Sequence, residues 1–228
     1  MSNLSDIITT QNRLEENISK RFDELQAQIT NAGSSKDTVA KVGEELRSFR
    51  EIIFGILSLL RKQIRECAIQ VDELESRNRR KALIVAGVPE KDKEDCTQMI
   101  LEVLNNKMGL SDITKSSIKV CHRLGAPNKE HHRPILVRFI SVDTKLMVWK
   151  TKTKLKGSSV SLKEFLTKTR QAVFTKSRLH FGMRSVWTQS GIIVIKTPSG
   201  VTHRITTDEE LGPLIAKYPK AAGKSSTV

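Results

Sequence analysis

Aromatic residues are scarce in this 228-residue chain, which holds seven Phe, two Trp and one Tyr. Its three cysteines, Cys67, Cys96 and Cys121, include no CxxC pair, which excludes a disulfide framework and favours a reducing compartment. The densest apolar run, residues 52–60, is too short to span a bilayer, and the first residues show no signal-peptide pattern. We therefore expect an intracellular protein, cytoplasmic or nuclear, that has no membrane partner.

Residue patterns that carry catalysis are also missing. Acidic residues after position 79 are scattered, apart from a cluster at 208–210 that suits a helix cap, so a metal-dependent nuclease is disfavoured. Gly223-Lys224-Ser225 imitates the end of a phosphate-binding loop, but Tyr218 stands where that motif needs its first glycine. We expect a protein that is not an enzyme and needs no cofactor.

A zinc site is disfavoured as well. Soft sulfur and imidazole ligands suit zinc, and the hairpin around the third cysteine offers Cys121, His122, His131 and His132. Their spacing matches no common zinc finger, and adjacent residues of a strand face opposite ways.

Positive charge is abundant, and it is concentrated in the last two thirds of the chain. Residues 1–78 hold 11 Lys and Arg against 13 Asp and Glu, a net charge of −2. Residues 79–228 hold 28 against 12, a net charge of +16, and the whole chain carries +14. Self-repulsion of that size destabilises a compact domain unless a polyanion neutralises it. The division predicts that the first part assembles the protein and the second binds nucleic acid.

Heptad spacing runs through residues 36–78, which we predict to form a coiled coil. Apolar residues recur in alternating steps of three and four at positions 39, 42, 46, 49, 53, 56 and 60. Ile52, Leu57 and Leu59 add apolar side chains at flanking positions, which favours three or more strands and hence a homotrimer. Residues 1–32 predict an amphipathic helix of the same interrupted coiled coil, with the break at Gly33. The alternative is one amphipathic helix packed on its own domain.

The remainder predicts an α+β fold in two parts. Residues 79–163 read as a ferredoxin-like, noncanonical RNA-recognition domain of order βαββαβ, with strands at 82–86, 117–123, 134–140 and 160–162 and helices at 92–110 and 142–155. Residues 164–219 predict a small C-terminal nucleic-acid-binding domain: a basic helix at 166–180, strands at 185–189, 191–197 and 201–206, and a last capped helix. We expect the tail, 220–228, to be disordered.

Lysine and arginine in this second part form groups that we predict to contact nucleic acid. One group lies where the coiled coil ends, one on the second helix of the first domain and its exit, and one on the basic helix: Arg77, Arg79, Arg80 and Lys81; Lys150, Lys152, Lys154 and Lys156; Arg170, Lys176 and Arg178. The alternative, a solvated surface, explains single lysine runs better than it explains a surplus of +16. Aromatic residues that stack bases on such a sheet are nearly absent, with Phe139 alone on the third strand, so we expect contact with the backbone instead.

Several segments, in order, resemble the first-open-reading-frame protein of LINE-type retrotransposons and the FP (few-polyhedra) proteins of baculoviruses and insect genomes. The similar segments are 75–81 with 83–90, His122-Arg-Leu-Gly125, Arg133-Pro-Ile-Leu-Val-Arg-Phe139, Leu166-Thr-Lys-Thr-Arg-Gln171, and Phe181-Gly-Met-Arg-Ser-Val-Trp187 with the hairpin after it. The resemblance implies a homotrimeric single-strand binder with chaperone activity, or a viral relative that acts in virion formation. It also implies backbone contacts by Arg79, Arg80, Arg123, Arg138 and Arg170. The coiled coil is short and a zinc knuckle is missing, which sets the chain apart from the longest relatives.

The resulting hypothesis is a trimeric binder of single-stranded RNA or DNA. The competing hypothesis is a virion or nuclear scaffold whose coiled coil binds a protein partner, favoured by the apolar Phe54 at an outward-facing position.

Overall fold

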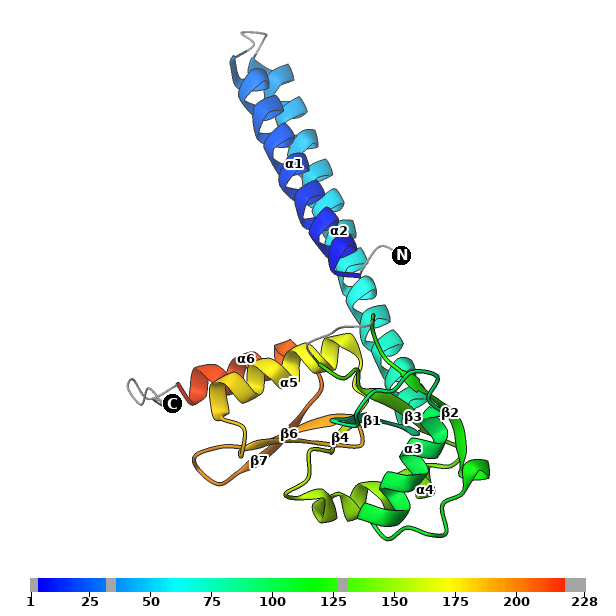
Figure 1. Ribbon diagram of the computed structural model, residues 1–228. Helices are drawn as coiled ribbons and strands as arrows, with labels where there is room; N and C mark the ends of the chain where they lie inside the picture. Colours follow the sequence, from blue (N-terminus) through cyan, green and yellow to red (C-terminus); the bar gives the residue numbers. More distant parts are fainter. Residues whose placement is uncertain (1–3, 32–35, 127–130, 220–228) are drawn as a thin grey trace. The chain divides into compact units, whose positions relative to one another are not determined.

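The computed structural model describes residues 4–31, 36–126 and 131–219, and it divides the chain into two compact units, Met1–Glu73 and Leu74–Val228 (Figure 1). Long helices precede two antiparallel sheets with their own helices, which confirms the mixed α+β class. No helix within the described ranges is both long and apolar enough to cross a membrane. The predicted helix break at Gly33, the predicted tail and Gly223-Lys224-Ser225 lie outside the described residues.

The first unit is a helical hairpin. Helix α1 (Leu4–Asn31) lies antiparallel to α2 (Lys36–Arg79), as Figure 1 shows. Gln11 Nε2 donates to Leu57 O at 3.1 Å, and Arg50 Nη1 lies 2.8 Å from Asp23 Oδ1. The sequence predicts that both helices belong to one interrupted coiled coil, and in the structure α1 packs antiparallel on α2 of the same molecule.

Helix α1 does not cover the whole apolar surface of α2. Leu46, Ile53 and Leu57 are half-buried, whereas Ile52 and Leu59 each remain 57% exposed. Ile52, Ile56 and Leu59, spaced three or four residues apart, form an exposed apolar stripe on α2, and Val42, Phe49, Leu60, Ile69 and Val71 are exposed as well. Phe54, expected to face outward, is half-buried, and its ring centroid lies 5.7 Å from the Arg50 guanidinium.

The second unit begins with a four-stranded sheet. Its strands are β1 (Ala82–Ala86), β2 (Ile118–Arg123), β3 (Ile135–Phe139) and β4 (Ser161–Glu164), in the order β2-β3-β1-β4 with every neighbour antiparallel. Helices α3 (Cys96–Glu102) and α4 (Val142–Lys150) pack on one face through Ile100 and Val148, against alternate strand residues such as Leu83 and Val137. A π-helical turn (Val103–Lys107) extends α3. Short 3-10 turns precede β2 (Lys115–Ser117) and follow α4 (Thr151–Leu155). The buried apolar residues of this part form one continuous core.

The first helix of this unit starts later than predicted. We expected it from position 92, but α3 begins at Cys96. Asp95 is the N-cap: its carboxylate accepts hydrogen bonds from Thr97 N at 2.8 Å and Gln98 N at 3.3 Å. Lys93 just before it has φ of +53°, which is not helical. A good N-cap satisfies the free amides of the first turn, and it therefore outweighs the acidic residues upstream as the start signal.

A three-stranded sheet with its own core completes the second unit. Strands β5 (Val186–Gln189), β6 (Ile192–Lys196) and β7 (Thr202–Ile205) form an antiparallel meander. Helices α5 (Lys168–Phe181) and α6 (Asp208–Lys217) cover one face of it through Val173 and Leu211 (Figure 1). The capping box predicted for α6 is present: Thr207 Oγ1 accepts from Glu210 N, and the Glu210 carboxylate accepts from Thr207 N. That carboxylate has a lowered pKa because, against the opposing effect of burial, the amides of Thr206 and Thr207 bond its charged form.

Candidate nucleic-acid interface

A cleft of about 610 Å³ opens within the second unit. One wall comes from α4, the turn after it and β4, and the other from α5 and β5. Its lining is unusually aromatic for this chain, since it includes both tryptophans: Trp149, Lys152, Ser161, Leu162, Lys163, Glu164, Leu166, Gln171, Phe174, Thr175, Arg178, Leu179, Met183, Trp187 and Thr188. The cleft therefore combines flat apolar rings with basic side chains.

Two of the aromatic rings each lie next to a basic side chain of the same helical segment. Lys152 Nζ lies 3.5 Å from the ring centroid of Trp149, and the Arg178 guanidinium carbon lies 4.2 Å from that of Phe174. Both pairs follow from local spacing, because residues three or four apart on a helical turn lie side by side. Such contacts hold the charge next to the ring face by cation–π attraction. Burial lowers the pKa of Lys152, with the Glu164 carboxylate opposing it.

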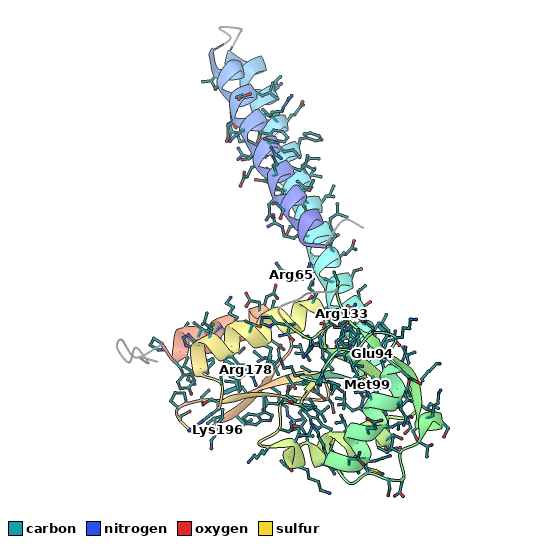
Figure 2. The ribbon with its side chains drawn as sticks, in the orientation of Figure 1. Arg65, Glu94, Met99, Arg133, Arg178 and Lys196 are labelled. Carbon is teal, nitrogen blue, oxygen red and sulfur yellow. The ribbon has the colours of Figure 1, made fainter. Side chains whose placement is uncertain are left out.

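Arg178 and Trp187 both line the opposite wall. Arg178 projects from α5 toward β5, where its Nε donates to Val186 O at 3.3 Å (Figure 2). Trp187 is the next residue along β5 and is 39% exposed. Leu179 and Met183 at the same wall are 74% and 73% exposed. A ligand in the cleft would therefore find a partly exposed tryptophan, two exposed apolar side chains and a positive charge held by a hydrogen bond on this wall.

Most of the predicted contact residues lie elsewhere. Of the thirteen, Lys152 and Arg178 line the cleft. Arg77, Arg80, Lys150 and Lys156 are exposed outside it. Others are exposed or half-exposed but have partners within the protein: Arg79 donates to Leu166 O and Glu75, Lys81 to Ile140 O, Arg138 to Asn78, Lys154 to Met108 O, and Lys176 to Asp208.

Arg123 does not suit the phosphate contact that the resemblance implied. Its side chain is 5% exposed and spans two carboxylate oxygens, with Nε 2.6 Å from Glu94 Oε1 and Nη2 3.0 Å from Oε2. The guanidinium also donates to Val88 O at 2.9 Å, Pro89 O at 2.8 Å and Arg133 O at 2.6 Å. These bonds fill the donor capacity of the group, so Arg123 braces the loop after β1 against the end of β2.

Arg170 is likewise an interior residue. It is 5% exposed, and its Nη1 donates to Gly191 O at 3.0 Å. The sequence analysis counted it among the contact residues of the basic helix, but in the structure it bonds the β5–β6 turn. A phosphate cannot reach a guanidinium in that position unless the packing opens.

The aromatic part of the cleft was missed by the sequence analysis. The RNA-recognition pattern places stacking residues on the strands of the first sheet, but Phe139 there is 1% exposed and belongs to the core. The useful signals were local: Trp149 three residues before Lys152, and Phe174 four residues before Arg178. Lys163, exposed on β4 beside the cleft, was missed as well.

The cysteine and histidine residues considered for zinc do not converge in the part of the chain that the structure describes, where no group of three or more possible metal ligands occurs. Cys121 is half-buried, and burial raises the pKa of its thiol to about 12. His132 Nδ1 accepts a hydrogen bond from Glu90 N at 3.3 Å. At neutral pH such a thiol remains protonated, which makes it a poor ligand and a poor nucleophile.

Compared with models of known protein families, the chain matches none, and no curated protein matches it.

Proposed function

We propose that this protein binds single-stranded RNA or DNA without strong sequence preference and without catalysing a reaction, and that the strand lies in the cleft. The proposal rests on one observation: a single cleft of a strongly cationic unit is lined by three aromatic rings and three basic side chains. These are Trp149, Phe174 and Trp187, and Lys152, Lys163 and Arg178.

Stacking explains why a single strand is the preferred ligand. Unpaired bases expose their faces, and each base stacked on an aromatic ring contributes roughly 1–3 kcal/mol whatever its identity. Lysine and arginine beside the rings can bind the phosphates between successive bases. A duplex hides its base faces in its own stack, so it would gain the charge contacts and lose the stacking.

The fold agrees with this proposal in a specific way. The strand order β2-β3-β1-β4 with helices after β1 and β3 suits a ferredoxin-like, RNA-recognition type of domain. The face away from the helices, however, carries Ile84, Leu136 and Arg138, and the aromatic residue of β3, Phe139, belongs to the core. We therefore place the strand in the cleft, with the first sheet as a support.

Assembly through α2 belongs to the same proposal. The exposed stripe that includes Ile52, Ile56 and Leu59 is far more apolar than a solvated helix surface requires. Burial against two further copies would give the homotrimer expected from the heptads, and three linked clefts would raise avidity by roughly 10²–10⁴. The resemblance to retrotransposon and FP proteins, with the chaperone activity it implies, fits such an assembly. The same stripe favours a second candidate function, a scaffold that binds another protein.

The test uses the full chain and a labelled single-stranded oligonucleotide. Because both tryptophans of the chain line the cleft, stacking should quench intrinsic fluorescence in step with the rise in anisotropy of the label. Trp187→Ala should weaken binding roughly tenfold, the loss of one stacked base. Lys107→Ala, an exposed cation outside the cleft, is the control for charge alone. Binding without any change in tryptophan fluorescence, and with Trp187→Ala equal to wild type, would place the strand elsewhere.

A further inference from the structure

The elements that form the two walls of the cleft are joined by a buried cluster of charged side chains. The cluster consists of Lys145 on α4, Glu164 at the end of β4, Arg170 on α5, and Ser190 with Gly191 in the β5–β6 turn. Lys145 Nζ lies 2.5 Å from Glu164 Oε1, and the two side chains are 3% and 4% exposed. Removing two charges from water is unfavourable, so a buried pair of this kind needs further hydrogen bonds to be stable.

The additional bonds come from the other sheet. Ser190 N donates to Glu164 Oε1 at 3.1 Å and Gly191 N donates to Oε2 at 3.0 Å, so both oxygens of the carboxylate accept from the turn. Gly191 O in turn accepts from Arg170 Nη1 at 3.0 Å. The Glu164 carboxylate thus connects the two walls of the cleft. On one side it bonds Lys145 of α4, and on the other it bonds the turn that follows β5.

The turn has the shape that this contact requires. Ser190 and Gly191 have φ of +54° and +81°, the left-handed conformation of the two central residues of a tight hairpin turn. Both amides then point to the same side. A Cβ atom at Gly191 would lie 2.8 Å from Ser76 Oγ and 3.7 Å from Arg170 Nη1, so the turn is packed against the last turns of α2 as well.

We infer that Glu164 is the positioning residue of the cleft: by bonding the β5–β6 turn to β4, its carboxylate sets how far the Trp149 wall stands from the Trp187 wall. The inference rests on the proposed function only where it concerns strand binding. The effect of the Glu164 contact on the separation of the two walls can be measured without a ligand. Glu164 lines the floor of the cleft, but its oxygens are already engaged, so its contribution to binding is geometrical.

This role distinguishes Glu164 from the residues that would contact the strand. Loss of a phosphate contact weakens binding and lowers its dependence on salt, because fewer counterions are released. Loss of a positioning residue weakens binding while every cation remains, and the slope of log affinity against log salt concentration then stays the same.

The experiment compares glycine variants of two hairpin turns in the full chain. Gly191→Ala places a Cβ atom 2.8 Å from Ser76 Oγ, so the turn or the Ser76 hydroxyl must shift, and the Lys145–Glu164 pair itself is left intact. Gly200→Ala is the matched control: Gly200 lies in the β6–β7 turn with φ of +84°, and a Cβ atom there meets nothing within 4 Å. The two variants share the backbone strain and differ in the contact. Glu164→Gln, which removes the charge at nearly constant shape, is the third variant.

For a single-stranded oligonucleotide, Gly191→Ala and Glu164→Gln should bind at least fivefold more weakly than Gly200→Ala at a temperature where all three are folded. The salt slope should equal that of wild type. Without ligand, acrylamide should quench tryptophan fluorescence more strongly in these two variants, and the amides of residues 190 and 191 should exchange hydrogen at least tenfold faster. If Gly191→Ala and Glu164→Gln both match Gly200→Ala in quenching and exchange, Glu164 does not set the cleft and the inference is overturned. If the variants differ in this way while wild type binds no strand, the inference stands and the proposed function fails.

Discussion

Replacement of Arg123 by alanine should destabilise the second unit rather than weaken nucleic-acid binding directly. The substitution leaves the Glu94 carboxylate, 10% exposed, without its ionic partner. It also leaves three backbone carbonyl groups, those of Val88, Pro89 and Arg133, without the donor they share. Breaking a buried ion pair by removing one partner costs about 3–5 kcal/mol.

The titration of Glu94 supports the same magnitude. The hydrogen bonds from Arg123 outweigh the effect of burial and hold the pKa of Glu94 at about 2, against an ordinary value of 4.5. At about 1.4 kcal/mol for each pKa unit, the difference corresponds to roughly 3 kcal/mol. Since the folded pKa is depressed, this stabilisation is present above pH 4.5 and is lost as the pH falls from there toward 2.

Thermal melts followed by tryptophan fluorescence measure this effect in the second unit alone, because both tryptophans lie there. At about 2–4 °C per kcal/mol for a unit of this size, Arg123→Ala should lower the Tm by roughly 10 °C at neutral pH. The difference from wild type should shrink as the pH approaches 2. Arg184→Ala, which removes an exposed arginine, should melt like wild type. A fully stable Arg123→Ala protein whose salt slope has fallen would refute this reasoning and restore Arg123 as a phosphate contact.

Three further predictions concern the cleft, the assembly and the last helix. Lys152→Ala should lower the slope of log affinity against log salt by about 0.7, the value for one phosphate contact on a single strand, whereas Lys107→Ala should leave it unchanged; equal slopes for the two variants would remove Lys152 from the interface. The full chain should sediment as a trimer at equilibrium, and Ile56→Asp in the exposed stripe of α2 should shift it toward monomer, while Glu51→Asp should not; a wild-type monomer at micromolar concentration would end the assembly proposal. Thr207→Ala should lower the free energy of unfolding of the second unit by about 1 kcal/mol through loss of the α6 N-cap, measured by urea titration, and a variant as stable as wild type would show that the cap contributes nothing there.

Much of the secondary structure could be predicted because it depends on neighbours along the chain. The capping box at Thr207, the turn at Ser190-Gly191 and the strand of 82–86 are patterns of a few consecutive residues, and each is present. The heptads of α2 likewise depend on spacing alone. The start of α3 was misplaced because several acidic residues precede it and only one, Asp95, caps the helix.

The candidate site was predicted less well, since charge in a sequence does not reveal which charges face solvent. Arg123 and Arg170 belong to the same basic composition as Lys152 and Arg178, yet they are engaged inside the unit. Their partners lie 10 to 35 residues away in sequence, and no periodicity connects them.

The sequence by itself determined the division into a near-neutral part and a cationic part, the heptad spacing, and the order of helices and strands. These properties follow from composition and short-range spacing. Tertiary structure alone decided that α1 packs on α2 and that the two tryptophans, 38 residues apart, line one cleft. It also decided that the Glu164 carboxylate accepts hydrogen bonds from the backbone amides of a turn in the other sheet. Each of these depends on which surfaces pack together, and packing balances burial, pairing and desolvation over segments that no local pattern brings into contact.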